Sequence, residues 1–320
     1  MNLHLLFDNL TNPALLFFVL GIVSVYLKSD LEIPSNSSKF ISLYLLFAIG
    51  FKGGQELSHE NWTYEIGWSM LFGIIIASVI PLYTFFILRN KFHVFDAGAI
   101  AAAYGSVSAV TFVTAVSYLE AHQLSLHGHM VAIMALMESP AIIIGLLLIS
   151  IFNKDDEQKI NKSDAIKHSL TNGSVLLIIG SLLIGYLANA KQAEGIKPFT
   201  NDLFKGFLAI FLLDMGITSG RKLKTFFSFG WFPIIFALII PLFNGCIIAF
   251  CSGFITADPT NRFMFAVLAA SASYIAVPAA MKISVPQSNP GLFLPMALAI
   301  TFPVNITIGM PLYFLVVQIS

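Results

Sequence analysis

The sequence has little charge, with only 17 basic and 17 acidic side chains among 320 residues, or 11% in all. Soluble globular domains carry about 25% charged residues. Together with a 57% share of hydrophobic residues, this deficit excludes an ordinary soluble protein and predicts an all-α integral membrane protein. The formal net charge of zero also argues against nucleic acid as a partner.

Cysteine is scarce as well. The only two cysteines, Cys246 and Cys251, lie in one apolar segment. Two such residues form neither a disulfide framework nor a zinc site, so we interpret them as small core residues. We therefore expect no metal other than a transported ion and no organic cofactor.

Long linkers are absent too, and apolar segments of about 17 to 25 residues, the length that crosses a bilayer, recur along the chain. We expect ten transmembrane helices, at residues 13–28, 39–57, 67–88, 96–119, 129–152, 172–190, 202–219, 229–252, 261–283 and 291–318. The most polar connection lies at the midpoint of the chain. It divides a first five-helix repeat, residues 1–152, from a second one, residues 171–320, and we interpret residues 153–170 as a linker.

The two halves resemble each other in sequence. Residues 79–83 (VIPLY) match residues 239–243 (IIPLF), and residues 105–108 (GSVS) match residues 270–273 (ASAS). Because each half has an odd number of crossings, the second half must be inverted relative to the first. Two inverted repeats of five helices are typical of secondary transporters.

Basic residues are distributed unevenly between the connections. Those after odd-numbered crossings hold twelve lysines and arginines, and the other connections hold five. Basic residues favour the cytoplasmic side. We therefore expect a cytoplasmic linker, both termini outside, and a multi-pass protein of the bacterial inner membrane.

Two clusters of small and polar residues interrupt the apolar fourth and ninth crossings. Lipid supplies no hydrogen bonds, so we expect these helices to be broken, with the clusters facing each other. Half-helices that begin there present free N–H groups and positive dipole ends to a small anion. The alternative is close helix packing through small residues. The predicted substrate-binding residues are Gly105, Ser106, Val107, Ser108, Ala270, Ser271, Ala272, Ser273 and Tyr274.

Two carboxylates lie at membrane depth. Glu138 and Asp214 each need a cation, a proton or a partner there. We expect at least one of them to bind a coupling Na⁺, and the alternatives are a protonated carboxyl or an ion pair with a lysine such as Lys52. The other predicted Na⁺ ligands are Thr111, Thr301 and Asn305.

Histidines cluster in the loop before the fifth crossing, at His122, His127 and His129. They suit a metal or a pH sensor, but their spacing matches no zinc signature, and a solvated loop is the simpler interpretation. An enzyme is the competing class of protein, with Ser106 as an intramembrane nucleophile. No histidine lies at membrane depth to act as its base, so we expect the protein not to be an enzyme.

Residues 103–112 (AYGSVSAVTF) and 272–281 (ASYIAVPAAM) resemble the sodium-dependent bicarbonate transporter family of the SbtA type. The resemblance implies core and gate domains drawn from both repeats, a homotrimer, and bicarbonate held between the serine-bearing broken helices. It also implies Na⁺-driven uptake by alternating access and a cytoplasmic PII-like regulator.

We therefore expect a sodium-coupled bicarbonate symporter. One alternative is a symporter of another small anion, such as a short carboxylate. The other is a cation/proton antiporter that uses Glu138 and Asp214.

Overall fold

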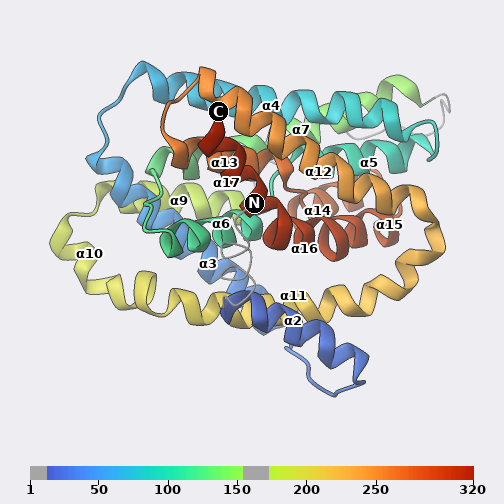
Figure 1. Ribbon diagram of the computed structural model, residues 1–320, viewed down its shortest axis with the longest axis horizontal. Helices are drawn as coiled ribbons and strands as arrows, with labels where there is room; N and C mark the ends of the chain where they lie inside the picture. The colour runs from blue at the N-terminus through green and yellow to red at the C-terminus, as the bar shows by residue number, and fades with distance from the viewer. Residues whose placement is uncertain (1–12, 154–172) are drawn as a thin grey trace.

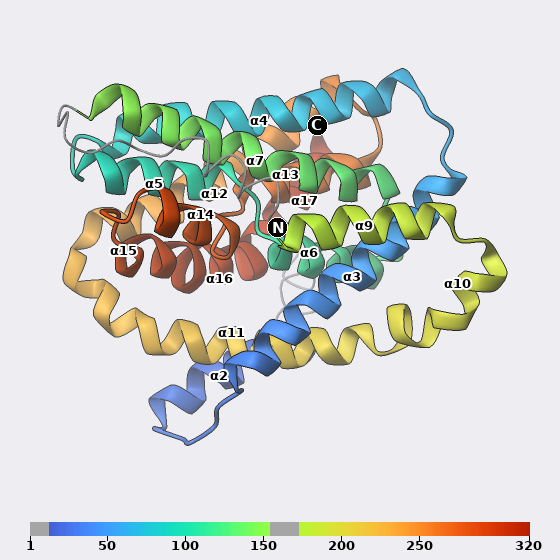
Figure 2. The ribbon, with the colours of Figure 1, turned by 180° about the vertical axis from the view of Figure 1, so that it is seen from behind.

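The computed structural model describes residues 13–153 and 173–320, and all regular secondary structure in these ranges is helical. The predicted linker, residues 153–170, lies outside the described residues apart from Asn153. Figures 1 and 2 show long helices that run side by side, with α4 and α7 along one edge of the molecule and α11 with α2 along the opposite edge.

Each of the ten predicted crossings overlaps one or more helices. The first half contains α2 (Pro13–Tyr26), α3 (Ser35–His59), α4 (Tyr64–Leu88), α5 (Val94–Gly105), α6 (Ala109–Ala121) and α7 (Gly128–Phe152). The second half begins with α9 (Gly173–Leu187), α10 (Ala190–Lys197), the π-helical turn η1 (Pro198–Asp202), α11 (Phe204–Phe226) and α12 (Trp231–Cys251). It continues with α13 (Pro259–Ala270), α14 (Ala276–Ser284) and a last helical run, α15 (Pro290–Pro295), η4 (Met296–Thr301), α16 (Phe302–Val304), η5 (Asn305–Gly309) and α17 (Met310–Ile319).

Six helical runs in the described ranges are long and apolar enough to cross a bilayer, which indicates a membrane protein. They are Tyr64–Leu88, Val94–Ala121, Gly128–Phe152, Ala190–Leu223, Trp231–Phe254 and Pro290–Ile319. Two shorter apolar helices, Leu15–Tyr26 and Leu176–Leu187, accompany them. The full set of ten crossings and their inversion stay predictions.

One group of helices is built on close contacts at glycine. Helix α2 packs along α11, and α3 packs along α9. A Cβ added at Gly216 of α11 would overlap the Phe18 carbonyl of α2, and one at Gly54 of α3 would overlap the Leu182 carbonyl of α9. Small residues at such crossings let helix backbones approach closely.

The second group contains α4, α5 and α7, which pack on one another, and α12, α13 and α17, which do the same. Contacts of α3 with α6 and α7, and of α9 with α7, join the two groups. The candidate site described below lies at this junction.

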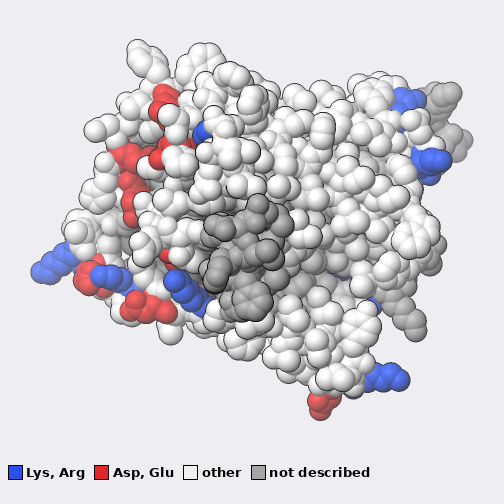
Figure 3. Space-filling view, in the orientation of Figure 1, with Lys and Arg blue, Asp and Glu red and all other residues white. Residues whose placement is uncertain are grey.

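Charged side chains gather at the two ends of the molecule. On the face shown in Figure 3, most of the visible acidic residues and several basic ones lie along the end that carries α10, and basic residues, with an acidic one near α2, lie at the opposite end. Between the two ends, the described surface of this face is mostly uncharged, and the long helices cross it. This distribution is typical of a protein whose helices span a hydrocarbon layer.

Two helical pairs are interrupted in the second group, to which α6 also belongs through its packing on α13, and α14 through its packing on α5 and α7. Helix α5 ends at Gly105 and α6 begins at Ala109, while α13 ends at Ala270 and α14 begins at Ala276. Ser106 and Ser271 take extended backbone conformations directly after α5 and α13. A Cβ at Gly105 would overlap the ring of Pro81 in α4, so this glycine is needed for close packing at the interruption.

Candidate functional site

The two interruptions are joined by crossed hydrogen bonds. The backbone N–H of Ser273 donates to the carbonyl of Ala103 at 2.8 Å. In return, the backbone N–H of Ser108 donates to Oγ of Ser271 at 3.0 Å. Backbone groups released at one interruption are thus satisfied by the other, which fixes the two segments against each other.

Two of the predicted serines hold the starts of the following helices. Oγ of Ser108 accepts the backbone N–H of Thr111 at 3.2 Å as the N-cap of α6, and Oγ of Ser273 accepts that of Val277 at 3.3 Å. Among the described residues, the Ser273 hydroxyl donates no hydrogen bond, and the Ser108 hydroxyl faces that of Tyr274 without forming a hydrogen bond of good geometry. Each hydroxyl therefore has an O–H that a ligand can accept.

The other two serines are engaged as donors. Oγ of Ser271 donates to the Leu268 carbonyl at 2.8 Å, and Oγ of Ser106 points to the Glu138 carbonyl at 3.5 Å. Neither lines the cavity described next. The contacts of Ser106 and Ser271 thus support the segment geometry, whereas Ser108 and Ser273 line the cavity.

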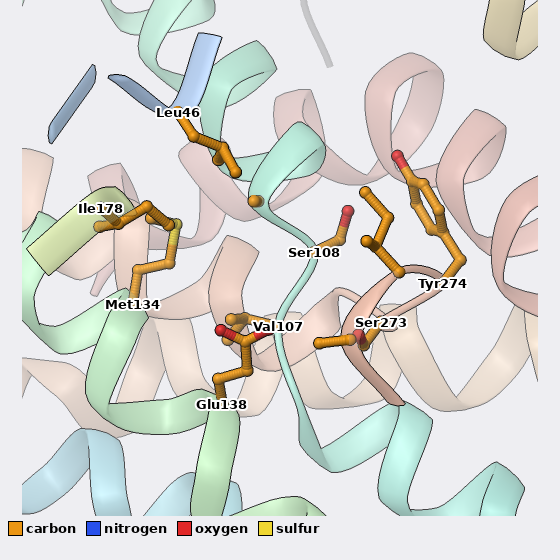
Figure 4. A pocket seen from close by; sticks show the side chains of 11 residues that line it. Leu46, Val107, Ser108, Met134, Glu138, Ile178, Ser273 and Tyr274 are labelled. Carbon is orange, nitrogen blue, oxygen red and sulfur yellow. The ribbon is translucent and has the colours of Figure 1, made fainter. Parts of the chain in front are cut away.

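A small cavity lies beside the crossed segments, between the two helix groups. Figure 4 shows Ser108, Ser273, Tyr274 and Glu138 around it, with the side chains of Leu46, Met134 and Ile178 opposite. Its complete lining is Leu46, Val107, Ser108, Ala109, Met134, Glu138, Ile178, Ser273, Tyr274, Ile275 and Ala276. The space open to the centres of water molecules is about 20 Å³, enough for one or two waters.

Helices α6 and α14 both begin at residues that line this cavity, Ala109 and Ala276. The first turns of two helices therefore border it, with N–H groups that have no partner inside their own helix. The side chain of Tyr274 adds a buried hydroxyl that forms no hydrogen bond of good geometry with the described residues. Its neighbour is the Ser108 hydroxyl, which faces it as a weak hydrogen-bond partner.

Glu138 supplies the one carboxylate among the lining residues. The residue is only 7% exposed, and its carboxylate makes no hydrogen bond or ion pair with the part of the chain that the structure describes. The sequence offered Lys52 as a partner, but Nζ of Lys52 lies 2.5 Å from Oε1 of Glu120 instead. Glu138 is thus a buried acid beside free O–H donors.

Asp214 does not line the cavity. It lies in α11, where its carboxylate accepts a hydrogen bond from the hydroxyl of Ser38 in α3. The structure does not bring Glu138 and Asp214 together in this cavity.

The remaining predicted Na⁺ ligands make hydrogen bonds around the interruptions. Oγ1 of Thr301 lies 2.8 Å from the Tyr104 hydroxyl and 2.8 Å from the Ala237 carbonyl. The Asn305 amide donates to the Ala270 carbonyl at 2.7 Å, at the end of α13. Thr111 is buried in the first turn of α6. In this conformation Thr301 and Asn305 support the segments and do not line the cavity.

Sequence reasoning missed several residues that shape the site. The apolar wall of Leu46, Met134 and Ile178 carries no local signal, because aliphatic side chains fill every crossing. Tyr313 was also missed; its hydroxyl donates to Oδ1 of Asn305 at 2.8 Å. A tyrosine deep in the last apolar segment was the available hint, since its hydroxyl needs a partner.

Two of the clustered histidines form a network with carboxylates at the end of the molecule, while His122 bonds to the Tyr118 carbonyl. Nδ1 of His129 lies 2.8 Å from Oε2 of Glu60, and His127 lies 3.5 Å from Glu60 and 3.4 Å from Asp258. The backbone N–H of Gly128 also donates to Glu60, at 2.7 Å. The network therefore joins the end of α3 to the starts of α7 and α13. The described residues contain no group of three or more His, Cys, Asp and Glu side chains that suits a metal ion.

The charges in this network stabilise one another. Hydrogen bonds to Asp258 and Glu60 raise the pKa of His127 to about 10. Burial alone would raise the pKa of Glu60, but hydrogen bonds from His127, His129 and Gly128 outweigh burial and lower it to about 2.

A pH dependence of stability follows from His127. Its pKa is higher in the folded state than the ordinary 6.5, so the stabilisation is complete below that value and is lost as the pH rises through about 10. The His127 side chain is 38% exposed, so solvent screening keeps the effect small. We expect the unfolding midpoint of the detergent-solubilised protein to fall by about 1–3 °C between neutral pH and pH ~10. The His127→Gln variant should lose this fall and His93→Gln should keep it; equal falls in both variants would contradict the assignment.

Interrupted helices that meet beside a cavity with a few polar groups, inside a bundle of apolar helices, are typical of secondary transporters. In agreement with this class, the Na⁺-dependent bicarbonate transporter superfamily matches residues 13–318, nearly the whole chain. The protein belongs to that superfamily, which confirms the resemblance seen in the sequence. A search of curated proteins gave no match. Membership in a transporter family also argues against an enzyme.

Proposed function

We propose that the protein is a sodium-coupled symporter that takes up bicarbonate across the bacterial inner membrane. The observation that carries the proposal is the cavity in which the free hydroxyls of Ser108 and Ser273 meet the first turns of α6 and α14. Family membership supports Na⁺ and bicarbonate as the transported pair.

The chemistry of the lining favours a monoanion. Hydroxyl donors and helix N-termini stabilise negative charge without a full opposing charge. No lysine or arginine lines the cavity. Bicarbonate has three oxygens to accept these donors, and the first-turn N–H groups at Ala109 and Ala276 complete the set.

Sodium coupling is assigned to Glu138. Its carboxylate and a bound anion would repel each other in a buried cavity, and a Na⁺ between them removes that repulsion. Each ion would therefore raise the affinity for the other. One Na⁺ per bicarbonate also cancels the cost of moving an anion into a negative cytoplasm, about 2.3 kcal/mol at a potential of about −100 mV. Asp214, Thr111, Thr301 and Asn305 would contribute only through a second ion site or another conformation.

Transport is proposed to occur by alternating access within ten crossings arranged as two inverted repeats. The reciprocal pairing of α2 with α11 and of α3 with α9 supports inversion, because the first helix of each repeat packs on the second helix of the other. The cavity is too small for bicarbonate as it stands. Since its apolar wall comes partly from α3 and α9, movement of that group away from the interruptions would open it.

The charge bias of the connections supports a cytoplasmic linker and external termini. The homotrimer and the PII-like regulator rest on the family resemblance alone. Among the alternative functions, a short carboxylate shares the charge and the planar O–C–O group of bicarbonate and stays the nearest competitor. A cation/proton antiporter is less favoured, because Glu138 and Asp214 do not share a cavity.

The proposed function predicts sodium-driven uptake. Proteoliposomes that contain the purified protein should accumulate labelled bicarbonate when a Na⁺ gradient points inward. The same vesicles should show only leakage when choline replaces Na⁺, because Na⁺ supplies the driving force. Excess unlabelled formate or acetate tests the competing substrate class, because a transported short carboxylate would inhibit the uptake of labelled bicarbonate. Uptake that does not depend on Na⁺ would contradict the proposal.

The two serines that line the cavity should contribute to bicarbonate affinity. Ser273→Ala and Ser108→Gly each remove a free hydroxyl, and glycine keeps most of the N-cap stability at position 108. Each should raise the KM for bicarbonate about tenfold, since a hydrogen bond to a charged group contributes about 1.5–3 kcal/mol.

Ser78→Ala is the matched control, because its hydroxyl bonds only to the Ile74 carbonyl of its own helix. That variant should keep the wild-type KM. Wild-type KM values in both Ser273→Ala and Ser108→Gly would mean that these serines only stabilise the helix starts.

A further inference from the structure

A second, larger cavity lies between the two helix groups. It is separate from the two interruptions at residues 106–108 and 271–275, which we call the serine segments. Its volume is about 220 Å³, and α3, α6, η1 and α11 enclose it. Its lining is more polar than that of the first cavity and consists of Ala48, Ile49, Lys52, Val116, Glu120, Thr200, Asn201, Phe204 and Lys205. An adjoining cavity shares Lys52, Thr200 and Asn201 with it and extends to α10.

Three charged side chains meet in this second cavity. Nζ of Lys52 lies 2.5 Å from Oε1 of Glu120, and Nζ of Lys205 lies 3.5 Å from Oε2 of the same carboxylate. The three groups carry one net positive charge. Both oxygens of the Glu120 carboxylate thus face an ammonium group, one from α3 and one from α11.

The second cavity and the first one lie along the same pair of helices, α3 and α6. Both are bordered by α3 and α6, through Leu46 and Ala109 in the first and through Lys52 and Glu120 in the second. From Ala109 to Glu120 the rise along α6 is roughly 16 Å at about 1.5 Å per residue. The seam between α3 and α6 therefore runs from the charged cavity toward the serine segments. By the charge bias of the connections, the charged end faces outside.

We propose that Lys52 and Lys205 form an outer site that recruits bicarbonate before it reaches the serine segments, with the Glu120 carboxylate as a tethered occupant that the anion displaces. The inference rests on the proposed function, because it assigns the entry step of the same transport. It adds a second anion site that the serine segments do not contain.

The geometry of Glu120 shows what the two lysines accept. A carboxylate is a planar O–C–O group with one negative charge, and bicarbonate has the same group with one further hydroxyl. The amide of Asn201 lines the same cavity, and so does the Thr200 hydroxyl, which donates to Oδ1 of Asn201 at 3.0 Å and keeps its oxygen as an acceptor for the hydroxyl of bicarbonate. Glu120 therefore occupies the place of the ligand in this structure.

Displacement of Glu120 is feasible because the ion pairs are partly solvated. The side chains of Lys52, Glu120 and Lys205 are 30%, 25% and 67% exposed. Ion pairs in contact with water are worth little, so exchange of one carboxylate for another anion requires little free energy.

The simpler explanation is a structural ion pair that only ties α3 and α11 to α6. The two explanations predict different directions for the changes in anion binding that the Glu120 and Lys52 variants cause. If the pair is structural, Glu120→Gln and Lys52→Gln break the same bond and should change transport in the same direction. If Glu120 competes with the substrate, its removal should strengthen anion binding, whereas removal of Lys52 should weaken it.

The test measures the KM for Na⁺-driven bicarbonate uptake in proteoliposomes that contain the full-length protein, at constant ionic strength. Glu120→Gln should lower the KM about threefold, and Lys52→Gln and Lys205→Gln should each raise it about three- to tenfold, the range of a partly screened unit charge. Lys191→Gln is the matched control, with the same charge change on α10 but outside both cavities. Its KM should stay at the wild-type value.

A lowered KM in Glu120→Gln cannot come from misfolding, which keeps the inference testable even if a lysine variant is unstable. Shifts of Glu120→Gln and Lys52→Gln in the same direction, or no shift in either, would overturn the outer site while uptake by the unaltered protein upholds the proposed function. Absence of Na⁺-driven uptake by the unaltered protein would overturn both.

Discussion

The backbone groups released at a helix interruption have no water to bind inside a membrane, so they must be satisfied within the protein. In this molecule two interruptions satisfy each other, through the Ser273 N–H to Ala103 and the Ser108 N–H to Ser271. Side chains from other helices complete the arrangement. Asn244 donates to the Ala269 carbonyl at 3.3 Å, and Asn305 holds the carbonyl of Ala270. With these needs met, the hydroxyls of Ser108 and Ser273 border the cavity that we propose to hold the anion.

The same arrangement explains why the site lies between two groups of helices. The serine segments belong to the group that contains α5, α6, α13 and α14, while α3 and α9 close the cavity with aliphatic side chains. In the proposed transport cycle, α3 and α9 would move away from the cavity while the serine segments keep their crossed hydrogen bonds. This movement would expose the hydroxyl donors. Glycine contacts bring α2 close to α11 and α3 close to α9 within that group.

Much of this organisation was accessible from sequence because it depends on local composition. The scarcity of charge predicts membrane helices, and the two clusters of glycine, alanine and serine coincide with the interruptions. What the sequence could not distinguish was which serine of each pair lines the cavity. Ser106 and Ser108 are chemically alike, and only the register of the crossed segments turns one to a carbonyl and the other to the cavity.

The acidic residues illustrate the same limit. Both Glu138 and Asp214 lie deep in apolar segments, yet one lines the cavity and the other bonds to Ser38, a residue 176 positions away. Lys52 was a plausible partner for Glu138 by depth alone, but the packing of α3 on α6 gives it to Glu120. Such pairings depend on contacts between distant segments, which periodicity and composition do not encode.

The central claim is that one cavity holds the anion and its coupling Na⁺ together, with Glu138 as the acid that links them. The most direct test is the Kd for bicarbonate of the purified protein, measured by calorimetry at increasing Na⁺ concentrations. We predict that saturating Na⁺ lowers this Kd about tenfold or more, within the usual range of coupling between sites. Asp214→Asn should keep this dependence and Glu138→Gln should lose it. A bicarbonate Kd that does not change with Na⁺, or full dependence in Glu138→Gln, would contradict the account.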